Sequence, residues 1–153
     1  MTHRMLSEAE GYELLKKNGI PVPEFSVVQS RSEAGAAADR LGYPLVMKVI
    51  SPRIIHKSDA GGVVTGILSA NDAEKAFDAI SSQVKAFDPS ANISGIIIER
   101  QEKKGLEILL GGRIDPTFGK IITVGMGGTL VELIRDVSIR VLPVSYADIY
   151  AMI

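Results

Sequence analysis

The chain has 153 residues, of which 46% are hydrophobic and 23% are charged, and its formal net charge is −1. This length fits one domain or part of a larger one, and the near-neutral charge offers no basic surface for nucleic acid or an anionic membrane. The absence of cysteine excludes disulfides and thiolate metal sites, and two histidines are too few for a zinc site without carboxylates. No apolar run approaches the roughly 20 residues that cross a bilayer, and the charged N-terminus lacks the apolar core of a signal peptide, so we expect a cytoplasmic protein.

The first hundred residues alternate between predicted helices and predicted strands. Residues 7–10 match a capping box, and the helix that they begin ends before Gly19. A second Ser-x-x-Glu pattern at 30–33 begins a helix that stops at 42–44, and residues 71–87 have apolar side chains at helical spacing. The predicted strands span residues 24–29, 45–50, 63–68 and 93–100.

The next forty residues are predicted as hairpin-like strands. The predicted strand 93–100 is followed by a polar turn and by a returning strand at 106–110. Further strands are predicted at 118–124 and 138–142, with a short helical turn at 129–134 between them. This mixture predicts an α+β (α/β-type) fold with an antiparallel component.

The end of the chain matches the start of a further helix. Residues 145–148 resemble a helix N-terminus, but the sequence ends at Ile153, about two turns later. An isolated helix of that length is marginal in water. We therefore predict that the sequence is a fragment of a longer protein, and a frayed natural C-terminus is the alternative.

Lys48 lies inside the otherwise apolar strand 45–50, where alternation places it on the same face as Val46 and Ile50. One interpretation is an edge-strand lysine that reaches water and blocks aggregation. The other is a compact ammonium aimed at phosphate oxygens.

The loop 51–62 combines several cations and the hydroxyl of Ser51 with the terminal pair Gly61 and Gly62. Glycines let backbone N–H groups approach an anion closely, so a lysine before the loop and a glycine pair after it predict a phosphate cradle. The sequence has no Walker A motif. The alternative is a loop with no ligand.

His56 lies in this loop, three residues before Asp59. A neutral imidazole is nucleophilic near pH 7, so His56 is a candidate phosphoryl acceptor or general base, with Asp59 as the group that orients it. The alternative is a solvent-exposed loop histidine.

Glu99 and Glu107 flank the polar turn 100–105. Such a turn can offer backbone groups to a purine edge and a carboxylate to ribose hydroxyls. The alternative is a pair of solvent-facing glutamates on a hairpin. A second glycine cluster at 125–128 suits an anion site or a tight structural turn.

The strings YPLVMKV at 43–49 and HKSDAGGV at 56–63 resemble the ATP-grasp domain of NDP-forming acyl-CoA synthetases, a family that includes ADP-forming acetate–CoA ligases. The resemblance covers nearly the whole chain, and HKSDAGGV is its most specific part. Further matching segments lie at residues 6–23, 112–119, 125–128 and 136–138. The resemblance implies an ATP-grasp domain over 1–153 that lacks its C-terminal portion, with a first lobe at about 1–105 and the beginning of a second at about 106–153.

The resemblance also implies a role for each matched residue. Lys48 would contact the nucleotide phosphates, the segment from Glu99 to Gln101 would be the adenine hinge, and Glu107 would lie near the ribose. His56 would be the transiently phosphorylated histidine. With the cradle residues, the predicted nucleotide-binding set is Lys48, Ser51, Gly61, Gly62, Glu99, Arg100, Gln101 and Glu107, and the predicted catalytic pair is His56 and Asp59.

The implied reaction converts acyl-CoA, ADP and phosphate into acid, CoA and ATP through a phosphohistidine relay. The cofactors would be ATP or ADP and Mg²⁺, and the partner would be a CoA-binding α subunit or domain that also carries the acyl-CoA. The family's late E-x-N-P-like segment is absent, so we predict no metal ligand in this chain and expect Mg²⁺ ligands beyond its C-terminal end. We therefore expect the chain alone to be inactive. The alternatives are the ATP-grasp-like region of a protein acetyltransferase and a non-catalytic nucleotide-binding module.

Overall fold

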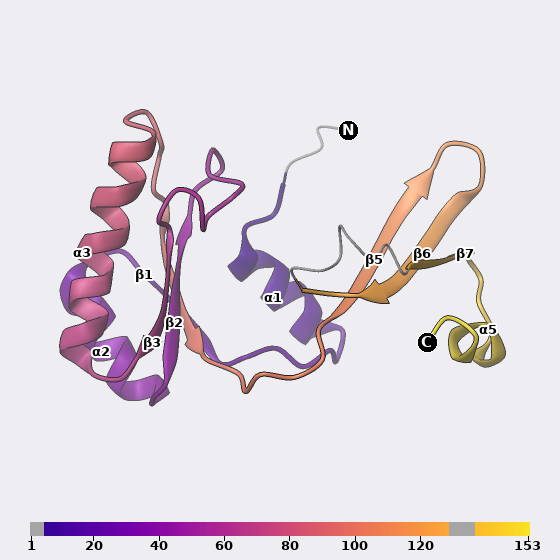
Figure 1. Cartoon of the computed structure of the whole chain (residues 1–153), viewed down its shortest axis with the longest axis horizontal. Helices are drawn as coiled ribbons and strands as arrows, with labels where there is room; N and C mark the ends of the chain where they lie inside the picture. The colour runs from indigo at the N-terminus through magenta and orange to yellow at the C-terminus, as the bar shows by residue number, and fades with distance from the viewer. Residues whose placement is uncertain (1–4, 129–136) are drawn as a thin grey trace. The chain divides into compact units, whose positions relative to one another are not determined.

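The computed structural model describes residues 5–128 and 137–153 and divides the chain into two compact units, Met1–Glu102 and Lys103–Ile153. Each unit is built on its own antiparallel sheet (Figure 1). The mixture of helices with antiparallel sheets confirms the predicted α+β class. The helical turn predicted at 129–134 lies outside the described residues.

The sheet of the first unit has four strands in the order β1-β4-β2-β3, and every neighbouring pair is antiparallel. Each predicted strand is present, with its ends shifted by up to two residues. The strands are β1 (Phe25–Val28), β2 (Leu45–Ile50), β3 (Val63–Ile67) and β4 (Gly95–Arg100).

Three helices accompany this sheet: α1 (Glu8–Lys17), α2 (Arg31–Leu41) and α3 (Ala70–Phe87). In Figure 1, α2 and α3 cover one face of the sheet and α1 lies on the other. Each helix begins after a serine whose hydroxyl accepts a backbone N–H from the first turn. The predicted capping box of α1 is complete. At α2 the Glu33 carboxylate accepts the N–H of Gln29 instead, one residue before the N-cap.

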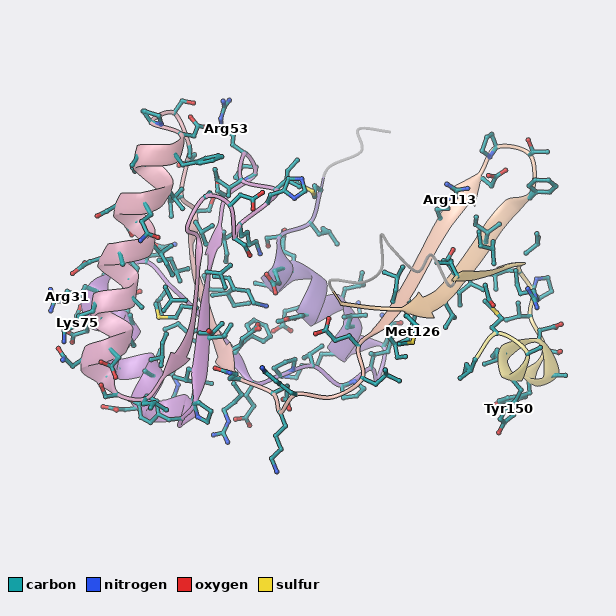
Figure 2. The ribbon with its side chains drawn as sticks, viewed as in Figure 1. Arg31, Arg53, Lys75, Arg113, Met126 and Tyr150 are labelled. Carbon is teal, nitrogen blue, oxygen red and sulfur yellow. The ribbon has the colours of Figure 1, made fainter. Side chains whose placement is uncertain are left out.

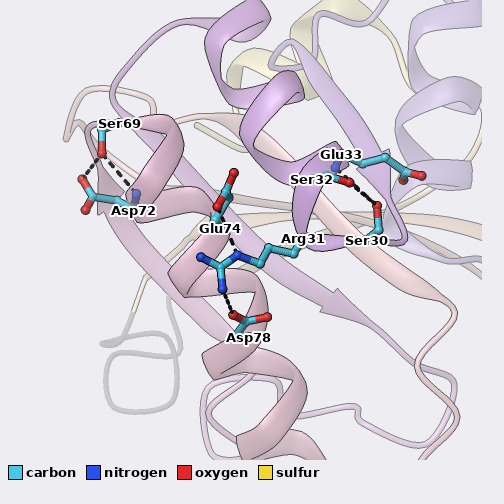
Figure 3. A network of polar contacts seen from close by, with 8 residues as sticks. All are labelled: Ser30, Arg31, Ser32, Glu33, Ser69, Asp72, Glu74 and Asp78. Atoms are coloured by element: carbon cyan, nitrogen blue, oxygen red, sulfur yellow. Dashed lines mark hydrogen bonds and ion pairs between the residues drawn. The ribbon is translucent and has the colours of Figure 1, made fainter.

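Small residues on α2 allow α3 to pack closely against it. The buried positions of α2 are Ala34, Gly35, Ala37 and Ala38. At the rim of this contact, Arg31 donates from Nε to Glu74 Oε2 and from Nη1 to Asp78 Oδ2, each at 3.0 Å (Figure 3). Arg31 and Lys75 lie on the outer side of the helix pair (Figure 2), where solvent screens the ion pairs, so their net contribution to stability is small.

Strand β4 lies at the centre of the first unit because both of its faces are apolar. Ile96 and Ile98 belong to the core cluster with Met47, whereas Ile97 points to the other face, and all are fully buried. The core therefore lies between the sheet and the pair α2 and α3, and the face towards α1 is left for mixed apolar and charged side chains.

The second unit consists of β5 (Ile108–Asp115), β6 (Gly119–Met126), β7 (Val137–Val141) and the short helix α5 (Tyr146–Tyr150). Its sheet order is β5-β6-β7. The hairpin predicted between 93–100 and 106–110 is wrong, because β4 pairs with β1 and β2 while β5 pairs with β6.

Strand β5 continues past the predicted end at residue 110. Its register with β6 runs from Ile108 opposite Met126 to Asp115 opposite Gly119, so the pairing extends over eight residues. Asp115 Oδ1 then accepts two backbone N–H groups and closes the turn. The glycine cluster 125–128 therefore begins inside β6 and not after it.

Candidate functional site

Lys48 lies on β2, which is flanked by β4 and β3, so the edge-strand interpretation is wrong. Its ammonium Nζ lies 2.6 Å from Glu8 Oε1 and 2.6 Å from Glu99 Oε1. Glu99 is only 6% exposed, which also rules out a solvent-facing glutamate at that position. A half-buried lysine between two carboxylates is held in one place and kept charged.

Glu8 connects this lysine to the loop 51–62. Its Oε1 accepts the Tyr12 hydroxyl at 3.1 Å, and its Oε2 accepts the ammonium of Lys57. Burial alone would raise the pKa of Glu8, but hydrogen bonds from Lys48 and Lys57 outweigh burial and lower it. Burial and the nearby carboxylates raise the pKa of Tyr12, so it stays a neutral donor.

The same balance holds for Lys48. Burial lowers the pKa of an ammonium, but the hydrogen bonds and charges of Glu8 and Glu99 raise the pKa of Lys48 above its ordinary value. Lys48 is therefore a permanent cation at neutral pH, and it has a third N–H that neither carboxylate requires. An anion on the α1 side of the sheet could accept a hydrogen bond from this third N–H of Lys48.

Backbone hydrogen bonds close part of the loop 51–62 on itself. The N–H of Gly61 donates to Ser58 O and that of Gly62 to Lys57 O. In this conformation neither glycine N–H is free for a phosphate, so their predicted cradle role stays a prediction that needs a change in the loop. At its start, Arg53 Nε donates to Asp88 Oδ2 at 2.9 Å beyond the end of α3.

Gly62 lies where there is no space for a side chain. A Cβ at this position would lie 2.6 Å from Val49 Cγ1 and 3.0 Å from the backbone oxygen of Lys57. We expect Gly62→Ala to lower the free energy of unfolding by about 1–3 kcal/mol, because the buried site has no room. Gly11→Ala is the matched control: nothing lies within 4 Å, and an alanine inside α1 should stabilise by about 1 kcal/mol.

Urea denaturation followed by circular dichroism would measure both variants. Equal stabilities for Gly62→Ala and the parent chain would show that the loop adapts at no cost.

His56 and Asp59 are both exposed on this loop. Although both are described, no hydrogen bond joins their side chains. The imidazole is thus accessible to an incoming group, and an orienting role for Asp59 stays a prediction.

A cavity of about 620 Å³ opens beside the start of α1 and the end of β2. Ser51 lies in its wall, and its buried Oγ has no hydrogen-bond partner among the described residues. Glu99 Oε2, beside Lys48, is the other buried oxygen without one in that part of the chain. Buried polar atoms normally have partners, so each of these two oxygens has hydrogen-bonding capacity left for water or a polar ligand. The cavity is lined by Met5, Leu6, Ser7, Glu8, Glu10, Ile50, Ser51, Pro52, Ile54, Ile55, Lys57 and Ser94.

Two residues of the predicted adenine hinge, Arg100 and Gln101, make hydrogen bonds within the first unit. Arg100 Nη1 donates to Leu41 O at 2.8 Å, and Gln101 Oε1 accepts the N–H of Gly66 at 2.8 Å. Gly66 has φ +71° and lies at the irregularity between β2 and β3, where its N–H would otherwise be lost to the sheet. An adenine contact by Glu99, Arg100 or Gln101 stays a prediction.

Glu107 belongs to the second unit and is exposed. Its backbone oxygen accepts the N–H of Gly127, and a Cβ at Gly127 would lie 2.8 Å from the Glu107 backbone. Gly127 is therefore required for a close backbone approach within this unit. The ribose contact predicted for Glu107 stays a prediction.

Sequence reasoning missed Glu8, Tyr12 and Lys57. Glu8 stands in a capping-box sequence, where an acidic residue already has an explanation in the helix dipole. The one sequence signal for Lys57 was its place next to His56 in the string HKSDAGGV. Only the packing of α1 on the sheet shows that these side chains meet Lys48.

Within residues 5–128 and 137–153, no three histidine, aspartate or glutamate side chains gather closely enough to hold a metal ion. No helix in the described part of the chain is long and apolar enough to cross a membrane.

The family model of the ATP-grasp domain matches residues 1–153. The chain therefore belongs to the ATP-grasp family, and the resemblance noted in the sequence is confirmed. It is 44% identical to the ADP-forming acetate–CoA ligase I subunit β of Pyrococcus furiosus, over 99% of this chain and 65% of that protein. It is 41% identical to the ADP-forming 4-hydroxybutyrate–CoA ligase of Nitrosopumilus maritimus, over 92% of this chain and 20% of that protein.

Solved structures of Ca. Korarchaeum cryptofilum acetyl-coenzyme A synthetase 1 have the same fold. A complex with coenzyme A and Ca-AMPCP is 39% identical, with a TM-score of 0.92 over 96% of this chain and 64% of that chain. A complex with Mg-AMPPCP, in which a phosphohistidine segment points towards the nucleotide site, is 33% identical with a TM-score of 0.77 over 95% of this chain and 62% of that chain. The chain thus spans less than two thirds of the length of these relatives.

Proposed function

We propose that this chain is the nucleotide-binding part of an ADP-forming acyl-CoA synthetase, which converts acyl-CoA, ADP and phosphate into acid, CoA and ATP. The observation that carries the proposal is the fixed cation Lys48, close to Glu8 and Glu99 and joined through Glu8 to the loop of the exposed His56. The named activities of the similar relatives support it, as does the nucleotide analogue in the similar synthetase.

In this proposal, different residues of the first unit bind the nucleotide and accept the phosphoryl group. The third N–H of Lys48 binds a phosphate oxygen of the nucleotide, and the Ser51 hydroxyl donates a hydrogen bond from the wall of the cavity that Glu8 also lines. A neutral nitrogen of His56 forms a P–N bond while the bond to the phosphoryl donor breaks. In the next step an ADP oxygen takes the phosphoryl group from His56, which gives ATP and restores the imidazole.

Positioning and charge stabilisation are the main requirements of such a transfer, because the transition state is loose and strongly anionic. Two cations in one charged network, Lys48 and Lys57, meet part of that requirement. Nucleotide bound with Mg²⁺ is the proposed ligand, and because no cluster of three ligand side chains lies among the described residues, we assign the metal no step here.

A CoA-binding α subunit or domain is the proposed partner, since the relatives include both β subunits and longer single chains. Acyl-CoA and CoA would reach the reaction through that partner. This proposal implies the cytoplasm as the location. The two compact units are proposed as the first lobe and the beginning of the second lobe of the domain.

Calorimetric titration with Mg-ADP tests the nucleotide assignment. We expect binding by a version of the chain lengthened at its C-terminus to the span of its relatives, and much weaker binding by the 153-residue chain. The reason is that the 153-residue chain spans less than two thirds of the length of these relatives. Failure of both versions to bind would leave a non-catalytic module as the better assignment.

A further inference from the structure

The loop that carries His56 is fixed by two buried side chains, Ile54 and Ala60, which are 4% and 3% exposed. Between these two anchors, residues 55–59 are exposed apart from Lys57, whose side chain is 25% exposed. Within this described stretch, only the Lys57 side chain makes an ion pair, and its partner is Glu8 on α1. The residue next to His56 thus makes the one side-chain ion pair of this described stretch.

Glu8 is itself held firmly at the first position of α1. The capping box formed by Ser7 and Glu10 fixes the first turn of the helix. The two oxygens of Glu8 then have different partners: Oε1 accepts from Lys48 and Tyr12, while Oε2 accepts from Lys57. One carboxylate thus joins a strand, a helix and the loop.

We propose that Glu8 is a positioning residue that holds the His56 loop, through Lys57, at a fixed place relative to Lys48. The hydrogen bonds are charge-assisted and half-buried, which makes them stronger than ordinary surface pairs. Without Glu8 the stretch 55–59 keeps its two apolar anchors and the loop's backbone hydrogen bonds, but it loses the ion pair that joins it to α1.

The ionisation of Glu8 supports this role across the physiological range. Burial opposes the charge, but Lys48 and Lys57 lower the pKa of Glu8 below its ordinary value of 4.5. A depressed carboxyl pKa gives stabilisation that is complete above the unfolded value and lost as the pH falls through the folded one. The contact with Lys57 is therefore intact at neutral pH.

Hydrogen exchange of the loop amides tests the proposal in the 153-residue chain. The reporters are the N–H groups of Ala60, Gly61 and Gly62, which donate to carbonyls of the loop. In Glu8→Gln we expect the exchange of these three amides to accelerate about tenfold, because the variant loses one charge-assisted hydrogen bond to the loop. The amides of α1 and β4 should keep their exchange rates. Glu13→Gln, an exposed position on the same helix, is the matched control and should leave the loop unchanged.

A variant on the loop side is needed as well, because Glu8→Gln can also disturb α1. Lys57→Gln removes the contact from the loop side, and it should accelerate the same amides to a similar degree. The double variant Glu8→Gln/Lys57→Gln should exchange no faster than the faster single variant, because both remove one interaction. Unchanged loop exchange in both single variants, or effects that simply add, would show that Ile54 and Ala60 suffice and would overturn the proposal.

The consequence for phosphoryl relay rests on the proposed function, and the two can fail separately. Faster loop exchange in Glu8→Gln, with no phosphohistidine in the lengthened parent, supports the positioning role and contradicts the relay. Phosphohistidine in the lengthened parent, with unchanged loop exchange in Glu8→Gln and Lys57→Gln, supports the relay and overturns the positioning role.

Discussion

Lys48→Met is expected to lower the free energy of unfolding by about 3 kcal/mol, the lower end of the range for breaking a buried ion pair. The physical reason is that the variant removes the cation from Glu99, which is 6% exposed and contacts Lys48 Nζ at 2.6 Å. Urea denaturation followed by circular dichroism would measure the loss. A variant as stable as the parent would mean that water reaches Glu99 and that the site is not closed.

Two controls separate stability from binding. Lys103→Met, at an exposed position outside any helix or strand, should change stability by no more than about 0.5 kcal/mol. Lys48→Met/Glu99→Leu removes both charges and should recover most of the stability, because no uncompensated carboxylate remains there. In the lengthened version this double variant should still bind Mg-ADP poorly, since it lacks the ammonium. If the double variant bound Mg-ADP as tightly as the parent, Lys48 would not be a nucleotide-binding residue.

His56→Ala is expected to abolish covalent phosphorylation while leaving nucleotide affinity largely unchanged. The imidazole is the proposed phosphoryl acceptor, and it lies exposed on a loop that the structure holds without its help. Incubation of the lengthened version with Mg-ATP labelled at the γ position, followed by acid and base treatment, would reveal an acid-labile, base-stable phosphohistidine. The variant should give no such label.

The sequence offers one direct control for this experiment, because His3 is the only other histidine. His3→Ala should label as strongly as the parent. Asp59→Asn tests the orienting role: since no hydrogen bond joins Asp59 to His56, equal labelling would remove Asp59 from the catalytic pair. Undiminished labelling of His56→Ala would contradict the relay assignment.

Local signals in the sequence were enough to predict most elements of the first unit. Ser7 and Ser30 cap their helices as predicted, and the apolar run at 45–50 is strand β2 without any shift in its ends. These signals are short in range: a hydroxyl satisfies a backbone N–H three residues away, and alternation operates along one strand. Pairing between strands has no such local mark, and for this reason the hairpin predicted across residues 100–105 was wrong.

For the site, the sequence by itself determined the family, through HKSDAGGV and YPLVMKV, and it singled out Lys48 and His56 as unusual residues. Only the tertiary structure decided that β2 is a central strand, that Glu99 is buried beside Lys48, and that Glu8 joins this lysine to the His56 loop. Glu8 and Lys57 are 49 residues apart, and no periodicity or capping rule relates residues at that distance. Their meeting depends on which face of the sheet α1 covers, and that choice is made by the packing of the whole unit.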